Sequence, residues 1–243
     1  MAGFGTRFLP ATKSMPKELM PVVDKPLIQY AAEEAVRAGI DTLIFVTGRH
    51  RRPLRQQSRA GGGTPRQGQA RAGRHGPQYP ARRRRVRQAE QLGLGHAVLC
   101  AERVVGHEPF AVLLADDFIV AAGKSQLSVM KVEGEDISKY GVVVPGEIDG
   151  SVRGLIEKPK YEDAPSDLAS IGRYVLTPDV FEILRGQEPG AGGEIQLADA
   201  INKMAITGDV ASNVLGGRRF DCGSVRGYLD ATMAMAERRA RKV

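Results

Sequence analysis

Two uninterrupted apolar runs mark the first half of the chain. Residues 42–47 (TLIFVT) and 110–115 (FAVLLA) have the composition of strands buried on both faces of a parallel sheet. Apolar residues at helical spacing precede each run, from Pro26 to Gly39 and over residues 93–105. A strand, a helix and a second strand in this order predict a right-handed βαβ layout and a Rossmann-like sheet.

Beyond residue 120 the pattern becomes that of an α+β arrangement. Apolar runs bounded by turn residues predict strands there, and amphipathic segments predict helices. The expected strands are residues 140–144, 152–157 and 171–176, and the expected helices are 178–184, 194–204 and 225–239. No internal repeat interrupts this order, so we expect residues 1–243 to form one α/β domain.

Residues 49–85 break the pattern. They are mainly Arg, Gly, Gln, Ala and Pro, with one Leu, one Tyr and no Val, Ile, Phe or Met. This composition buries too little apolar area to order a chain, so we expect the segment to be disordered or aberrant. The change at residue 49 and the return at Val86 are both abrupt, a pattern that two compensating frameshifts in a GC-rich gene would leave.

The net charge of +7 comes from this segment. Thirteen arginines, with no lysine and no acidic residue, lie between Arg49 and Arg87, which leaves −6 for the rest of the chain. A nucleic-acid-binding module is therefore one alternative, based on non-specific contacts of the arginines with phosphate. Because Tyr79 is the one aromatic residue there and no nucleic-acid-binding fold is visible, we expect no nucleic-acid partner.

Cysteine usage and hydropathy bear on the compartment. Cys100 and Cys222 are too few for a disulfide framework in 243 residues. No apolar run approaches the ~20 residues needed to span a bilayer, and the N-terminus lacks the order of a signal peptide. We expect a soluble cytoplasmic protein with no membrane partner.

The first residues carry the strongest chemical motif. A glycine loop, Ala2-Gly3-Phe4-Gly5-Thr6-Arg7, is followed by Pro16-Lys17-Glu18. Glycines lack a Cβ, so their backbone N–H groups can approach a polyphosphate closely. Arg7 and Lys17 can neutralise a triphosphate and a departing pyrophosphate. The combination predicts a phosphate-binding loop.

With the blocks that follow it, this segment resembles the signature of bacterial UTP–glucose-1-phosphate uridylyltransferases, also called UDP-glucose pyrophosphorylases. The opening string is GFGTRFLPATKSMPKELMPVVDKPLIQYAAEEA. Later blocks, in the family's order, are RQAEQLGLGHAVLCA, DD after an apolar strand, YGVV, EKP, GRYVL, PGAGGEIQLADAI and FDCGSVRGYL. The resemblance covers residues 1–48 and 86–240, apart from a poorly matched stretch near 119–138. It implies a mixed sheet of the sugar-nucleotidyltransferase type, UTP and glucose 1-phosphate as substrates, and Mg²⁺ as cofactor.

The resemblance also implies a role for each matching residue. The catalytic residues would be Arg7, Lys17 and Lys158, which neutralise phosphate charge. The metal ligands would be Asp116 and Asp221. The substrate-binding residues would be Ala2, Gly3, Gly5 and Thr6 along the nucleotide phosphates, Glu18, Gln88 and Gly93 near the uracil, and Gly141, Glu157, Gly172 and Arg173 at the sugar phosphate.

General chemistry supports some of these roles and leaves others open. A carboxylate at the carboxyl end of a strand, such as Asp116, suits Mg²⁺, although such a residue can also serve as a cap or a turn. Asp221 could instead cap the terminal helix. Arg173 and Glu194 could form a structural ion pair. His96 is expected to be structural rather than a general base.

The chain departs from the family pattern in several places. The family has a strand of the type KAVFPV before its glycine loop, whereas this sequence starts in the loop, so we expect a sheet that is incomplete at its N-terminus. The stretch 119–138 is short, Val225 stands where lysine is usual, and Ala115 replaces a proline. Three alternatives stay open: transfer involving another base or sugar, such as thymidylyl transfer; an inactive relative that binds nucleic acid; and a homo-oligomer formed through the terminal helices.

Overall fold

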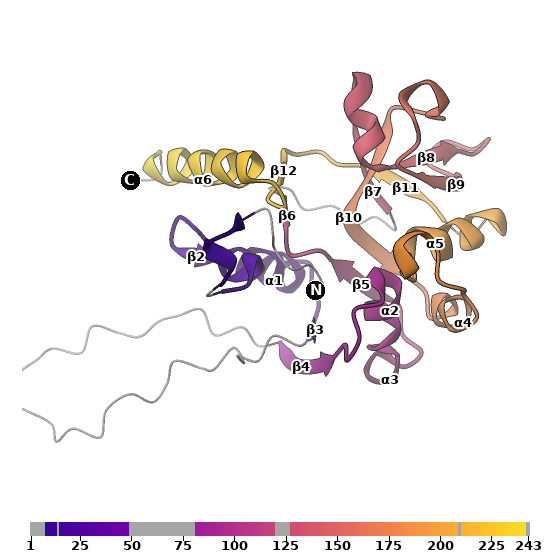
Figure 1. The fold of residues 1–243 in the computed structure, drawn as a ribbon, viewed down its shortest axis with the longest axis horizontal. Helices are drawn as coiled ribbons and strands as arrows, with labels where there is room; N and C mark the ends of the chain where they lie inside the picture. Colours follow the sequence, from indigo (N-terminus) through magenta and orange to yellow (C-terminus); the bar gives the residue numbers. More distant parts are fainter. Residues whose placement is uncertain (1–7, 14, 49–80, 120–126, 209, 242–243) are drawn as a thin grey trace, which may run out of the picture.

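The long strand β10 (Leu168–Leu176) organises the largest sheet (Figure 1). The structure is a computed structural model that describes residues 8–13, 15–48, 81–119, 127–208 and 210–241. The N-terminal part of β10 pairs with β8 (Gly141–Pro145), and its C-terminal part pairs with β5 (Phe110–Leu113). The strand β7 (Leu127–Lys131) pairs with both parts. A single strand thus joins segments from the two halves of the chain.

The outer strands make this sheet mixed. β9 (Val152–Glu157) runs antiparallel to β8, and β11 (Ser212–Val214) runs parallel to β7, which gives the order β11-β7-β10-β8-β9. The expected strands at 140–144, 152–157 and 171–176 are confirmed as β8, β9 and the C-terminal part of β10. The strands β7 and β11 lie where the sequence pattern predicts no element.

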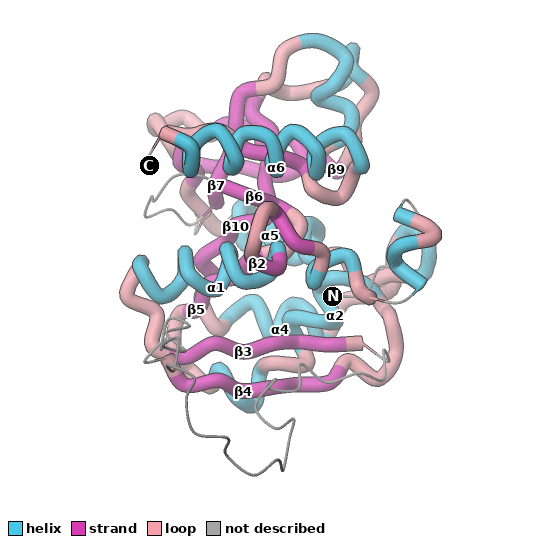
Figure 2. Tube along the Cα trace, turned by 90° about the vertical axis from the view of Figure 1, so that its left-hand side faces the viewer, coloured by secondary structure: helices cyan, strands magenta, loops and turns pink. Residues whose placement is uncertain are grey.

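A second, two-stranded parallel sheet consists of β3 (Thr42–Thr47) and β4 (Arg82–Arg87), which run side by side in Figure 2. The helix α1 (Leu27–Arg37) precedes β3. An apolar cluster that includes Ala35, Leu43 and Leu113 packs α1 and β3 against β5. The expected strand at 42–47 and the helix before it are therefore confirmed.

β4 corrects one prediction. Residues 82–85 belong to the arginine-rich segment for which the sequence predicts no regular structure, yet they form a strand paired along its length with β3. The ladder is made by backbone groups, and the side chains of Arg82 to Arg85 are exposed, so this part of the strand forms without apolar residues. Residues 49–80 lie outside the described part of the chain.

The main core lies between the large sheet and three helices, α2 (Gly93–Leu99), α4 (Asp179–Arg185) and α5 (Leu197–Ile206). Buried side chains of this core include Val129, Leu184 and Ile201, and each contributes about 1.5–3 kcal/mol by leaving water. The expected helices at 178–184 and 194–204 correspond to α4 and α5. The helix expected over 93–105 is divided into α2 and α3 (Glu102–Val105).

A smaller apolar cluster holds the terminal helix α6 (Val225–Ala240) over α1, as both figures show. Its buried members are Val22, Leu27, Phe220, Cys222 and Ala231. Phe220 belongs to β12 (Arg219–Asp221), which pairs antiparallel with β6 (Asp117–Ile119). The end of the chain is thereby brought back to the segment that follows β5.

The remaining elements are short. β1 (Pro21–Val22) pairs with β2 (Lys25–Pro26), and 3-10 helices span Ala11–Lys13, Lys17–Leu19, Gly134–Lys139, Tyr161–Asp163 and Ala191–Gly193. None of the helices in the described ranges is both long enough and apolar enough to cross a membrane.

Candidate active site

The pairing of β6 with β12 brings Asp116 and Asp221 together. Asp116 lies in the turn between β5 and β6, and Asp221 ends β12. The backbone N–H of Cys222 donates to the carbonyl oxygen of Asp116 at 2.9 Å. A Cβ added to Gly223 would lie 2.9 Å from Oδ1 of Asp221 and 3.2 Å from Oδ2 of Asp116. Both carboxylates therefore border one point, and the absence of a side chain at Gly223 leaves it open.

The cap of α6 is a different residue from Asp221. Ser224 precedes the helix, and its Oγ accepts a hydrogen bond from the N–H of Gly227 at 3.1 Å. Asp221 Oδ1 accepts instead from the N–H of Gly223 at 2.9 Å. The N-cap of α6 is thus Ser224, and Asp221 is left for another role.

Lys17 and Glu18 lie beside this carboxylate pair, in the 3-10 helix Lys17–Leu19. The ammonium of Lys17 donates to Oδ2 of Asp116. Glu18 is buried. Burial raises the pKa of the Glu18 carboxyl, and the charge of Asp116 acts in the same direction, while a backbone hydrogen bond and Lys17 oppose the rise. Four residues predicted from the sequence therefore meet here.

Gln88 is fully buried, immediately after β4, and is not a surface residue. Its Nε2 donates to the carbonyl oxygen of Gly93 at 3.0 Å. Gly93 has a positive φ of 93° and begins α2. A Cβ there would lie 2.8 Å from Cβ of Glu194, so the conformation and the close approach both require glycine.

The start of α2 is joined to the segment before α5 by backbone hydrogen bonds. Gly95 N–H donates to the carbonyl of Ile195 at 2.8 Å, and Ile195 N–H donates to the carbonyl of Leu92 at 2.7 Å. A Cβ on Gly95 would lie 2.7 Å from that Ile195 oxygen. The two glycines of the GLGHA block are thus explained by close contact with the GEIQL block.

Gly141, Glu157 and Lys158 form a second group, at the paired ends of β8 and β9. Gly141 is directly opposite Glu157, and a Cβ on it would lie 3.0 Å from Oε2 of Glu157. Lys158 Nζ lies 3.3 Å from Oε1 of Glu157, and both side chains are largely exposed. The guanidinium of Arg219, from β12, lies 5.2 Å from the ring centre of Tyr140, next to Gly141. This contact joins the group to the strand that carries Asp221.

Arg173 forms an ion pair with Glu34 and not with Glu194, the partner suggested by the sequence. Its guanidinium donates to both carboxylate oxygens of Glu34 in α1, at 2.8 and 2.9 Å, rather than to Glu194. It also donates to the carbonyl oxygens of Leu114, at 2.8 Å, and Gly172, at 3.1 Å. Arg173 is 7% exposed. No sequence signal connects residues 34 and 173, so only the structure reveals Glu34.

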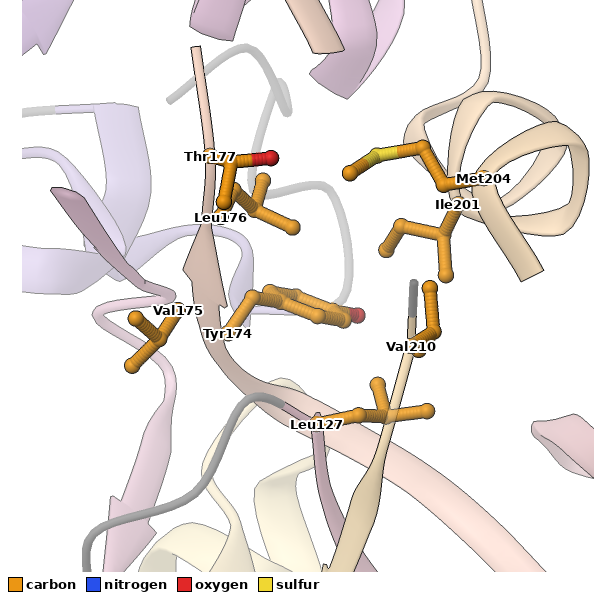
Figure 3. A pocket seen from close by; sticks show the side chains of 8 residues that line it. All are labelled: Leu127, Tyr174, Val175, Leu176, Thr177, Ile201, Met204 and Val210. Carbon is orange, nitrogen blue, oxygen red and sulfur yellow. The ribbon is translucent and has the colours of Figure 1, made fainter. Parts of the chain in front are cut away.

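Some predicted residues cannot be placed. Ala2, Gly3, Gly5, Thr6 and Arg7 lie outside the described residues. Within the described ranges, no three His, Cys, Asp or Glu side chains converge as in a metal site made by protein alone. A small hollow seen in Figure 3 contains none of the predicted residues, and its walls are mainly apolar: Leu127, Tyr174, Val175, Leu176, Thr177, Ile201, Met204 and Val210.

Comparison with known proteins identifies the family. The family model described as nucleotidyl transferase matches residues 1–238. A UTP–glucose-1-phosphate uridylyltransferase of Pseudomonas aeruginosa is 44% identical in an alignment of 259 positions that covers 95% of this chain and 92% of the relative. The chain belongs to the nucleotidyl transferase family, among the UTP–glucose-1-phosphate uridylyltransferases. A uridylyltransferase of Staphylococcus epidermidis is 43% identical, covering 97% of this chain and 90% of the relative.

Solved structures agree with this membership and with the predicted mixed α/β fold. A UDP-glucose pyrophosphorylase complexed with UDP-glucose has a TM-score of 0.82 and 39% identity, covering 98% of this chain and 96% of the other. A UTP-bound enzyme of the same type from Acinetobacter baumannii has a TM-score of 0.79 and 33% identity, covering 96% and 90%. A putative glucose-1-phosphate thymidylyltransferase from Bacillus anthracis, 21% identical with a TM-score of 0.75, shares the fold.

Proposed function

We propose that this uridylyltransferase joins UTP to α-D-glucose 1-phosphate, releasing pyrophosphate, at the site around Asp116 and Asp221. The observation that carries the proposal is the meeting of these two carboxylates with the ammonium of Lys17. The three residues come from distant parts of the sequence. Opposite charges gathered at the end of a strand suit a reaction between two phosphate groups.

The two aspartates fit Mg²⁺. This ion binds through one or two carboxylates together with substrate phosphates, so a complete protein cage is not needed. When bound there, Mg²⁺ would neutralise charge on the reacting phosphates. Asp116 and Asp221 would hold it, because an oxygen of each carboxylate borders the space that a side chain at position 223 would fill.

Positioning and charge neutralisation then account for the chemistry. An anionic phosphate oxygen of the sugar attacks the α-phosphorus of UTP in line, so no general base is required. Lys17 can neutralise the phosphates, and each such contact formed in the transition state is worth about 3 kcal/mol. The same proposal assigns Ala2, Gly3, Gly5, Thr6 and Arg7 to the triphosphate.

The sugar phosphate is assigned to Gly141, Glu157 and Lys158. Glu157 can accept hydrogen bonds from sugar hydroxyls, Lys158 can bind the phosphate, and both are exposed enough to meet a ligand. Gln88, Gly93 and Glu18 are assigned to the uracil side. Arg173, with Gly172, is assigned to the wall of the site, because Glu34 and two carbonyl groups already engage its guanidinium.

The compartment and the assembly state are also part of the proposal. Both cysteines are free thiols, which supports a reducing compartment such as the cytoplasm. Val225, Leu229 and Met233 lie at four-residue spacing on α6 and are about half exposed, which supports self-association through this helix.

A coupled pyrophosphate assay tests the function. Purified protein supplied with UTP, glucose 1-phosphate and Mg²⁺ should release pyrophosphate, and omission of any one of the three should stop it. A panel with dTTP, CTP and galactose 1-phosphate should show preference for the first pair. A folded preparation that uses another nucleotide or sugar better would replace the proposed substrates.

A further inference from the structure

The buried side chain of Gln88 forms a hydrogen bond with the partly buried side chain of His96 in the first part of α2. Gln88 Nε2 lies 3.0 Å from the carbonyl oxygen of Gly93 and 3.1 Å from Nδ1 of His96. Its Oε1 is buried and has no hydrogen-bond partner among the described residues. His96 Nε2 lies 3.8 Å from Sγ of Cys100, one helical turn further on.

The carbonyl of Gly93 fixes the orientation of the Gln88 amide. A carbonyl oxygen can only accept, so the amide nitrogen must face it. The second amide hydrogen then points at Nδ1 of His96, which must be an unprotonated acceptor. The imidazole is therefore the neutral form with its hydrogen on Nε2, directed toward the weakly accepting sulfur of Cys100.

With both amide hydrogens engaged, Oε1 is the part of Gln88 left to bind a ligand. A buried acceptor without a donor is unfavourable, and a ligand N–H relieves it. Uracil carries an N–H between its two carbonyl groups, whereas cytosine has a lone pair at that ring nitrogen. Because Oε1 is closed to solvent, the base gains access to it only when neighbouring groups move.

We propose that His96 is a positioning residue that holds the Gln88 amide with its oxygen toward the base, and so favours a base with a ring N–H over cytosine. This inference rests on the proposed function, which places Gln88 at the uracil. His96 itself touches no reacting atom. It acts together with the carbonyl of Gly93: each accepts one amide hydrogen of Gln88, and the pair of contacts holds the amide nitrogen away from the base.

Two variants of His96 test the inference. His96→Leu removes the acceptor, and we expect the KM for UTP to rise about tenfold, with kcat and the KM for glucose 1-phosphate nearly unchanged. The preference for UTP over CTP should fall by a similar factor. His96→Asn can place an oxygen near the position of Nδ1 and should recover most of both losses. A leucine variant with the wild-type KM and base preference, or an asparagine variant no better than leucine, would overturn the inference.

A measurement on the unmodified protein guards against misfolded variants. Nitrogen-15 NMR of the histidine side chains should show His96 protonated at Nε2 and not at Nδ1, and a hydrogen on Nδ1 would contradict the assignment. Wild-type protein that does not use UTP refutes the proposed function, whereas an active wild type with unaffected His96 variants refutes only the role of His96.

Discussion

The ammonium of Lys17 contacts the carboxylate of Asp116, although the two residues are far apart in the sequence. The contact joins the segment after the glycine loop to the turn that ends β5. It is partly open to solvent, with side-chain exposures of 19% and 29%. Incoming phosphate would therefore compete with Asp116 for Lys17, and a metal ion would compete with Lys17 for Asp116.

Replacement of Lys17 by methionine should reduce kcat about 100-fold, since one charge contact with the reacting phosphates is lost. The thermal unfolding temperature should change little, because the ion pair is partly exposed. Steady-state kinetics with both substrates would measure the effect. Lys131→Met, at an exposed position of β7, is the matched control and should retain wild-type kcat. Equal losses in the two variants would argue against a specific role for Lys17.

Gly141→Ala should affect the sugar phosphate and not the nucleotide. The added methyl group would lie 3.0 Å from Oε2 of Glu157 and displace that carboxylate. We expect the KM for glucose 1-phosphate to rise several-fold, with the KM for UTP unchanged. Gly216→Ala, where the new Cβ would meet no atom within 4 Å, is the control. If only the KM for UTP rises, Gly141 does not belong to the binding site of the sugar phosphate.

The Arg173–Glu34 pair should matter for stability. Glu34→Gln leaves the guanidinium of a nearly buried arginine without a full counter-charge, and we expect a loss of about 3 kcal/mol in the free energy of unfolding. Urea titration would measure it. Glu102→Gln disrupts the exposed pair with Arg185 and should leave stability almost unchanged. If Glu34→Gln lowers the free energy of unfolding no more than Glu102→Gln does, the Arg173–Glu34 pair does not stabilise the fold.

The sequence alone predicts some strands of this fold and misses others. β3 and β9 match their predicted bounds, because β3 is a continuous apolar run and β9 contains an apolar segment close to a turn. β4 could not be predicted, since its pairing depends on the edge of β3 rather than on its own arginines. Glu34 could not be predicted as the partner of Arg173 either, because the two residues are far apart in the sequence and meet only where α1 packs near β10. The resemblance identifies Asp116 and Asp221 as site residues, but only the structure shows that their carboxylates meet beside Gly223.

Glu18 should make stability depend on pH. Burial raises its pKa in the folded protein, so the protonated carboxyl favours folding, and its contribution is lost as pH rises from below the unfolded value of 4.5 through the raised folded value. Glu18→Gln removes that titration. The difference in unfolding free energy, variant minus wild type, should therefore increase with pH over this range. A difference that stays flat or falls would contradict the raised pKa.

Asp116 and Asp221 are the residues that we propose hold the metal used for uridylyl transfer. Phosphorus-31 NMR of UTP, glucose 1-phosphate and Mg²⁺ with the purified protein tests this assignment, comparing wild type with Asp116→Asn, Asp221→Asn and a control at an exposed position, Asp149→Asn. We predict signals of UDP-glucose and pyrophosphate for wild type and control, and rates at least 100-fold lower for the other two. Full activity of Asp116→Asn and Asp221→Asn at limiting Mg²⁺ would show that these two aspartates do not hold the metal.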